Sequence, residues 1–344
     1  MKKNLSLMIA VLLTVACLSA CSFGSKQTDT DTGKIHIVTT IFPEYDWVMN
    51  ILGDNPAKAD VTMLLDAGVD LHNFQPSAED ILKISTCDLF IYVGGESDEW
   101  VNDALQEAPN TDMIVINLLD VLGDAVKEEE VIEGMQVEEH AHEHEHKNGE
   151  DDHHDDHEHE HAEDDVEYDE HVWLSLKNAA VLVESISGIV QKLDPDNADL
   201  YKMNTAAYIE QLNSLDSEYQ AAVSNASYTT ILFGDRFPFR YLADDYNLLY
   251  YAAFIGCSAE TEASFETITF LAQKVDELSL PAVMTIEGTD QRIAQTIIRN
   301  TETKDQRILT MDSMQATTAK DVANGTTYLS IMERNLSVLN DALN

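Results

Sequence analysis

A repeated alternation of short apolar runs and amphipathic stretches, starting at Lys34, constrains the fold of this chain more than any other feature. This alternation is typical of parallel β-sheets covered by helices. The first series predicts four strands, at 35–40, 60–65, 87–93 and 113–119. The second series predicts a strand that starts at 228 and strands at 248–255, 282–287 and 307–311. Because both series have the same order of elements, we expect an α/β fold of two lobes with parallel sheets flanked by helices.

A long helical pattern separates the two series. Apolar residues from Asn197 to Ser224 recur near the 3.6-residue period of a helix. At ~1.5 Å per residue this helix would be roughly 40 Å long, enough to join two lobes as a rigid backbone. We therefore expect an N-terminal lobe at 34–195, a linking helix at 196–224 and a C-terminal lobe at 225–344. The last helix is expected to run without a break from Thr318 to Leu343.

The N-terminal residues are predicted to lie outside the fold. Two lysines precede an apolar run from Leu5 to Ala16, and Leu18-Ser19-Ala20-Cys21 carries the small residues of a cleavage site. We expect a signal peptide at 1–20, lipidation of Cys21 and a flexible tether at 21–33. The apolar run is shorter than the ~18 to 20 residues that span a bilayer, which disfavours a transmembrane anchor. The sequence thus predicts an extracytoplasmic, lipid-anchored protein.

An acidic, histidine-rich loop, expected at 128–165, lies between the last strand of the first lobe and His171. From Glu128 to Glu170 the chain holds 21 of its 63 acidic residues. Nine of the twelve histidines lie in this loop: His140, His142, His144, His146, His153, His154, His157, His159 and His161. Such a tract is too polar to pack a core, and its composition is typical of metal binding. We expect it to bind several ions weakly.

The formal net charge of −43 limits the partners of the protein. Nucleic acids and anionic membranes are bound through clusters of Lys and Arg, so both are excluded as partners. A negative field attracts divalent cations instead.

Chemistry-bearing side chains follow the predicted strands. His72 follows the second strand of the first lobe, while Glu287 and Asp312 follow the last two strands of the second. Ligands of open α/β sheets bind at the carboxyl ends of the strands, so these residues can face one cleft, with His171 beside it. Each alone is equally consistent with a solvated loop residue. Together, two histidines and a carboxylate suit a borderline divalent metal such as Zn²⁺.

The motifs together resemble a known family. The motifs are the cleavage site at Cys21, Asp66-Ala67-Gly68-Val69-Asp70-Leu71-His72 with Pro76-Ser77, the histidine-rich loop, Asp169-Glu170-His171-Val172-Trp173-Leu174-Ser175 and Leu309-Thr310-Met311-Asp312-Ser313-Met314. They look like those of the zinc and manganese solute-binding proteins of ABC importers. The resemblance covers essentially the whole mature chain. It implies two lobes that hold a metal through two histidines, a third His or Glu, and an Asp. His72, His171 and Asp312 match three of these positions. It also implies a zinc cargo, with manganese as the alternative, a membrane permease as partner, and a monomer.

The remaining ligand position departs from the family pattern. The segment Phe239-Arg240-Tyr241-Leu242 aligns Arg236 with this ligand, and a guanidinium has no lone pair to give a metal. Asp235, Glu287 and Cys257 are the nearest alternatives by element position. We expect Arg236 itself to form a bidentate ion pair with a carboxylate, preferably that of Glu287.

Two other classes of function stay open. A catalytic zinc site also has two histidines, a carboxylate and an open position. However, no general base of the His-Glu-x-x-His kind lies beside a ligand, so no enzyme is expected. A surface metal buffer that uses only the histidine-rich loop is the other class.

Overall fold

The computed structural model describes residues 33–55, 58–106, 108–136, 167–258 and 262–344. The expected signal peptide, Cys21, nearly all of the tether and the nine clustered histidines lie outside these residues. The account below concerns the unit Ile35–Asn344. Within the described part of the chain, no helix combines the length and apolarity that a membrane crossing requires.

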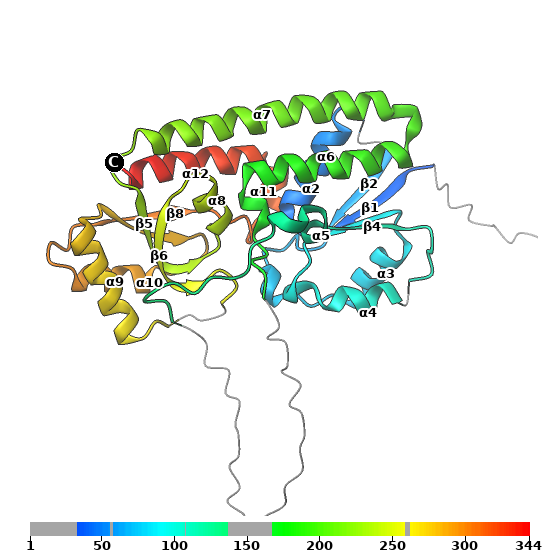
Figure 1. Ribbon diagram of the computed structural model, residues 1–344. Coiled ribbons are helices and arrows are strands. Elements are labelled where there is room, and N and C mark those ends of the chain that lie inside the picture. The colour runs from blue at the N-terminus through cyan, green and yellow to red at the C-terminus, as the bar shows by residue number, and fades with distance from the viewer. Residues whose placement is uncertain (1–32, 56–57, 107, 137–166, 259–261) are drawn as a thin grey trace, which may run out of the picture. The chain divides into compact units, whose positions relative to one another are not determined.

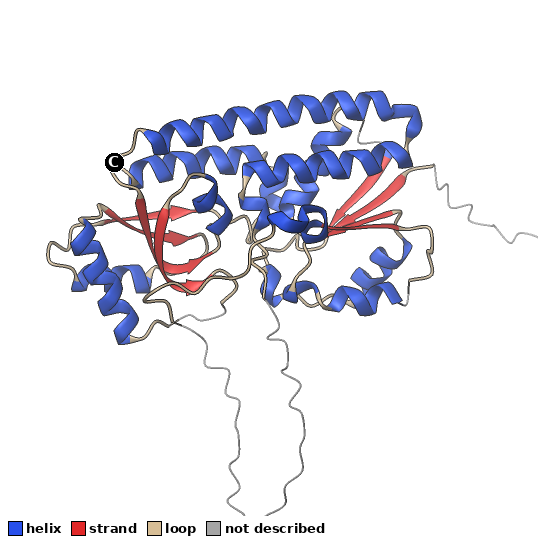
Figure 2. Ribbon diagram, viewed as in Figure 1, coloured by secondary structure: helices blue, strands red, loops and turns tan. Residues whose placement is uncertain are grey.

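Two four-stranded parallel sheets form the framework of this unit (Figure 2). The first has the order β2-β1-β3-β4, with β1 at Ile35–Thr39, β2 at Ala59–Met63, β3 at Leu89–Tyr92 and β4 at Ile114–Asn117. The second has the order β6-β5-β7-β8, with β5 at Thr230–Phe237, β6 at Leu249–Ile255, β7 at Ala282–Ile286 and β8 at Arg307–Met311. The prediction of two parallel α/β halves is thus confirmed. In each sheet the strand order reverses beside the first strand, where open parallel sheets place their ligands.

Helices connect and cover the strands (Figure 1). They are α2 Phe42–Leu52, α3 Ala78–Thr86, α4 Trp100–Gln106, α5 Leu118–Leu122, α6 Leu176–Leu193, α7 Ala198–Ser224, α8 Arg240–Asp245, α9 Phe265–Leu278, α10 Arg292–Asn300, α11 Ala319–Ala323 and α12 Tyr328–Ala342. Short 3-10 turns include η2 at Leu71–Asn73, η3 at Glu96–Asp98 and η5 at Val172–Leu174.

The long helix α7 contacts both halves, as predicted. It packs against α2 and α6 of the first half and against α12 of the second (Figure 1). The side-chain amide of Asn204 donates to the Ile51 carbonyl at 3.0 Å. Toward the other end, the Tyr219 hydroxyl donates to the Met332 carbonyl at 2.7 Å. Helix α7 is therefore the structural backbone that both sheets share.

A buried aromatic group fixes the segment that carries His171. The Trp173 indole donates to the Ser313 carbonyl at 2.9 Å, which ties this segment to the loop after β8. The Tyr328 hydroxyl donates to the Trp173 carbonyl at 2.7 Å, and its ring packs edge-on against Trp47 at 5.4 Å. Trp47, Trp173 and Tyr328 are all fully buried. The core thus holds the backbone at His171 in one position.

Two local predictions were wrong. The last helix is not continuous, because the chain turns through Gly325 at a φ of 93°. Helix α12 then starts afresh at Thr327, whose side chain accepts the Ser330 N–H. In addition, the fourth predicted strand ends early. Asn117 caps the short helix α5 by accepting the Asp120 N–H at 3.1 Å.

Candidate metal centre

His171 is completely buried and its imidazole is held in one orientation. Its Nδ1 lies 2.9 Å from Asp169 Oδ1, which also accepts the His171 backbone N–H. A carboxylate only accepts, so Nδ1 carries the proton and Nε2 has a free lone pair. Burial lowers the pKa of His171 despite the charge of Asp169, which favours the neutral ring. A neutral imidazole backed by a carboxylate is the usual form of a metal-binding histidine.

His72 is held in a similar way. It lies on η2, where the Asp70 side chain caps the turn by accepting the His72 N–H at 3.1 Å. Its Nδ1 lies 2.7 Å from Ser97 Oγ and 3.4 Å from Glu170 Oε2. Although burial raises the pKa of Glu170, the hydrogen bonds from His72 and Ser97 bring it below its usual value. The ionised Glu170 therefore favours a proton on Nδ1 of His72 and a lone pair on its Nε2.

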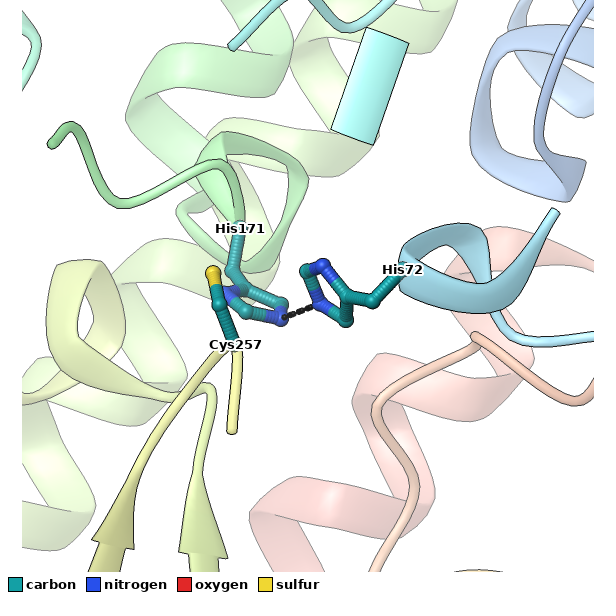
Figure 3. Close-up of side chains that lie close together, drawn as sticks. All are labelled: His72, His171 and Cys257. Atoms are coloured by element: carbon teal, nitrogen blue, oxygen red, sulfur yellow. Dashed lines mark hydrogen bonds between the residues drawn. The ribbon is translucent and has the colours of Figure 1, made fainter. Parts of the chain in front are cut away.

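The two imidazoles point their Nε2 atoms at each other across 3.2 Å (Figure 3). Two nitrogens at this separation can both lie ~2.0–2.1 Å from one zinc ion. The sequence analysis selected these two histidines, and the structure brings them together from segments 99 residues apart. The pair offers two of the four ligands that a tetrahedral site needs.

Gln315, which the sequence analysis did not single out, touches both histidines. It lies in the loop after β8 and is 6% exposed. Its amide Nε2 is 3.1 Å from His72 Nε2 and 2.9 Å from His171 Nε2. Its Oε1 accepts from Arg236 Nη2 at 3.2 Å and lies 3.1 Å from Ser313 Oγ. No sequence signal marks this residue, since a glutamine in a loop is ordinarily solvated.

The guanidinium of Arg236 lies beside Gln315 and not beside Glu287. Its Nη2 forms an ion pair with Asp70, and its Nη1 donates to the Ser258 carbonyl at 3.4 Å. Burial raises the pKa of Asp70, but the charges of Arg236 and His72 and the hydrogen bonds that both donate together bring it below its usual value. The predicted Arg236–Glu287 pair was therefore wrong. Glu287 instead accepts from the backbone N–H and hydroxyl of Ser313, both at 2.7 Å.

Cys257 lies close to the two histidines (Figure 3). One ligand atom from each of His72, His171 and Cys257 lies within 4.8 Å of the other two. Among the described residues, no other three His, Cys, Asp or Glu side chains come together in this way. Gly256 allows this approach, because a Cβ there would lie 3.0 Å from His171 Cε1. The thiol hydrogen-bonds Glu129, and burial together with that carboxylate raises the pKa of Cys257 well above its ordinary value.

The structure does not bring the remaining acidic candidates to the histidine pair. The Asp312 carboxylate accepts the Met314 N–H at 2.9 Å and lies 3.7 Å from Arg334 Nη2. Asp235 accepts the N–H groups of Arg236 and Ile286, at 3.0 and 3.3 Å. Burial raises the pKa of Asp235, and burial with the charge of Asp312 raises that of Glu287 to about 6. Asp312 as a ligand stays a prediction.

A cleft of about 540 Å³ opens beside the centre. Asp70, Arg236, Glu287 and Gln315 line it, together with residues of the β7–α10 loop. The histidine pair therefore lies close to solvent while its rings remain buried.

The fold thus has two parallel α/β halves, and the histidine pair of the first half contacts Gln315 of the second. The chain belongs to the family of the periplasmic zinc-uptake complex component A, ZnuA, whose family model matches residues 37–342. This membership confirms the resemblance drawn from the sequence. The family is described by a zinc-uptake component, and the relatives below are named as zinc-binding or zinc-uptake proteins, so the enzyme alternative is set aside.

Individual relatives agree with this assignment. The high-affinity zinc uptake system protein ZnuA of Bacillus subtilis is 30% identical over 332 residues, which are 96% of this chain and 94% of that protein. The zinc-binding lipoprotein AdcA of Streptococcus pneumoniae is 32% identical over 98% of this chain. The chain spans only 60% of the length of AdcA. The Zn(II)-bound ZnuA-like domain of AdcA superposes with a TM-score of 0.66 at 28% identity, over 90% of this chain and 99% of that domain.

Proposed function

We propose that this chain is the extracytoplasmic receptor of an ABC importer, anchored to the membrane through Cys21. It binds a divalent metal ion, zinc in preference to manganese, at His72 and His171 and delivers it to a membrane permease. The observation that carries the proposal is the pair of Nε2 atoms 3.2 Å apart, each on a ring whose other nitrogen is held by the protein. Two imidazoles favour zinc, whereas manganese prefers oxygen ligands.

Metal analysis of the mature protein tests the proposal. The protein is purified without added metal and its metal content is determined by elemental mass spectrometry. Zinc affinity is then measured by competition with a chelator. We expect one tightly held zinc ion per chain and weaker binding of manganese. A protein that neither contains a metal ion nor competes with the chelator would contradict the proposal.

Cys257 is the candidate third ligand with the best support from geometry. Its sulfur and one ring nitrogen of each histidine lie within 4.8 Å of one another, whereas Asp312 would first have to leave Met314 and Arg334. A thiolate together with two imidazoles suits zinc and disfavours manganese.

Cys257→Ser is expected to weaken zinc binding by about ten-fold or more, because a metal–sulfur bond is lost. Cobalt in place of zinc provides a direct readout, since thiolate ligation gives a sulfur-to-cobalt charge-transfer absorption. The parent should show this band and the variant should lack it. Cys87→Ser, at the other described cysteine, is the matched control and should keep it. A parent protein without the band would exclude Cys257 and return the third position to Asp312 or water.

Deletion of residues 138–165 is expected to leave the tight site intact and to abolish weak binding of further ions. The flanking contacts are kept, because Gln136 N–H still donates to Ala253 and Glu129 N–H to Glu167. Calorimetric titration with zinc distinguishes the two kinds of site. The matched control is the full-length chain in which asparagine replaces all nine loop histidines. Loss of the tight site on deletion would instead support the surface-buffer alternative.

A further inference from the structure

The amide of Gln315 lies where a cation would bind the two histidines, and its orientation follows from its neighbours. A guanidinium can only donate, so the atom of Gln315 that faces Arg236 Nη2 at 3.2 Å must be the oxygen. The amide nitrogen is then directed at His72 Nε2 and His171 Nε2, at 3.1 and 2.9 Å. These two distances are those of ordinary hydrogen bonds.

Both histidines meet this amide with a lone pair. Asp169 Oδ1 accepts the Nδ1–H of His171. The Nε2 of His72 is an acceptor because the Gln315 amide nitrogen that faces it at 3.1 Å can only donate. A hydrogen bond between the two Nε2 atoms, which lie 3.2 Å apart, requires the proton of one ring on Nε2. With both ring protons on Nδ1, two lone pairs face each other and repel unless a positive group lies between them. The amide group has two N–H bonds, one for each nitrogen. The N–H groups of Gln315 therefore present positive partial charge to both Nε2 lone pairs, as a metal ion would.

Arg236 and Asp70 hold the amide in this position. The guanidinium donates to Gln315 Oε1 and pairs with Asp70, which caps the turn that carries His72. The Arg236 and Asp70 side chains are only 15% and 21% exposed, so solvent screens their attraction weakly. The network thus joins both imidazoles to the second half of the protein through neutral hydrogen bonds and one ion pair.

We propose that Gln315 is an internal competitor of the metal. Its amide nitrogen uses both Nε2 lone pairs, so a cation can bind both histidines only after the amide has turned away. Binding exchanges two N–H···N hydrogen bonds for two metal–nitrogen bonds, and return of the amide assists release. This inference rests on the proposed function and adds a residue that sets the affinity of the site. Such a competitor suits a receptor that must give up its cargo.

Gln315→Ala tests the competition, because it removes the amide without supplying a ligand. Loss of two neutral hydrogen bonds from the competing state is expected to tighten zinc binding roughly ten-fold or more. Zinc affinity is measured by chelator competition on protein stripped of metal. A residue that only supported the fold would give the opposite sign, a loss of affinity.

Gln315→Glu is the second variant and is expected to have a larger effect. A carboxylate oxygen in place of the amide nitrogen would face both lone pairs, which destabilises the protein without metal and provides a ligand with it. The unfolding temperature should therefore fall in chelator and rise in zinc, relative to the parent. Gln291→Glu is the matched control, since Gln291 lines the same cleft and its amide donates to Thr310 at 3.3 Å.

The outcomes separate this inference from the proposed function. If the parent binds zinc through His171 but neither Gln315 variant binds more tightly than the parent, the competition is refuted and the function stands. The same conclusion follows if Gln291→Glu tightens binding as much as Gln315→Glu does. If neither the parent nor the variants bind a metal, both proposals are wrong. Tighter binding in the two Gln315 variants alone supports the competition.

Discussion

His171→Ala is expected to weaken zinc binding by more than about 100-fold. Loss of a partner that merely orients a metal-binding histidine typically costs about 10–100-fold in affinity, so loss of the ligand itself should cost more. His171 is also the better fixed of the two, since it is fully buried and Asp169 binds both its backbone and its ring. Chelator competition with the purified variant measures the change.

His36→Ala is the matched control for this variant. His36 lies on β1 with its side chain 46% exposed, and it should leave the affinity unchanged. Circular dichroism should show the folded secondary structure in both variants, because Trp173 and Tyr328 still anchor the segment around residue 171. Parental affinity in His171→Ala would remove this residue from the metal site and refute the proposed function.

The sequence predicted the framework because strands buried in parallel sheets are nearly continuous apolar runs. Runs such as Leu89–Tyr92 and Ala282–Ile286 have no competing interpretation once helical patterns flank them. The break between α11 and α12 could not be predicted in the same way. A glycine inside a helical pattern is tolerated in many helices, and only the turn at Gly325 with the cap at Thr327 ends this one.

The sequence selected the two histidines that the structure brings together, but it did not select the neighbours whose place depends on tertiary contacts. His72 and His171 were chosen because each lies in a segment that resembles the family. Gln315 lies just after the family-like segment that ends at Met314. Its place beside the histidines depends on the course of the loop after β8, where the Trp173 indole donates to the Ser313 carbonyl. The Arg236–Glu287 pair failed for the same reason. Ser313 turns its N–H and hydroxyl to Glu287, and Arg236 reaches Asp70 in the other half.

Arg236→His is expected to tighten zinc binding by about 100-fold, through two effects that act together. The imidazole supplies a lone pair at the position that the family resemblance assigns to a ligand, whereas the guanidinium offers none. The substitution also removes the donor that holds Gln315 Oε1, so the amide leaves the histidine pair more readily. One added nitrogen ligand and one weakened competitor each contribute roughly a factor of ten. Chelator competition on metal-stripped protein measures the affinity.

The cost of this change falls on the protein without metal. Asp70 keeps the His72 N–H but loses its ion-pair partner while its side chain is only 21% exposed, and a carboxylate without a counter-charge there destabilises the fold. Bound zinc would compensate that charge, so the unfolding temperature of Arg236→His should depend more steeply on zinc concentration than that of the parent.

Arg292→His is the matched control, because Arg292 lines the same cleft but pairs with Asp290 at an exposed position. Arg236→Ala separates the two effects: it frees Gln315 without adding a ligand and should reach only the smaller gain. If Arg236→His binds no more tightly than Arg236→Ala, residue 236 is not a ligand position and the alignment with the family at this strand is wrong.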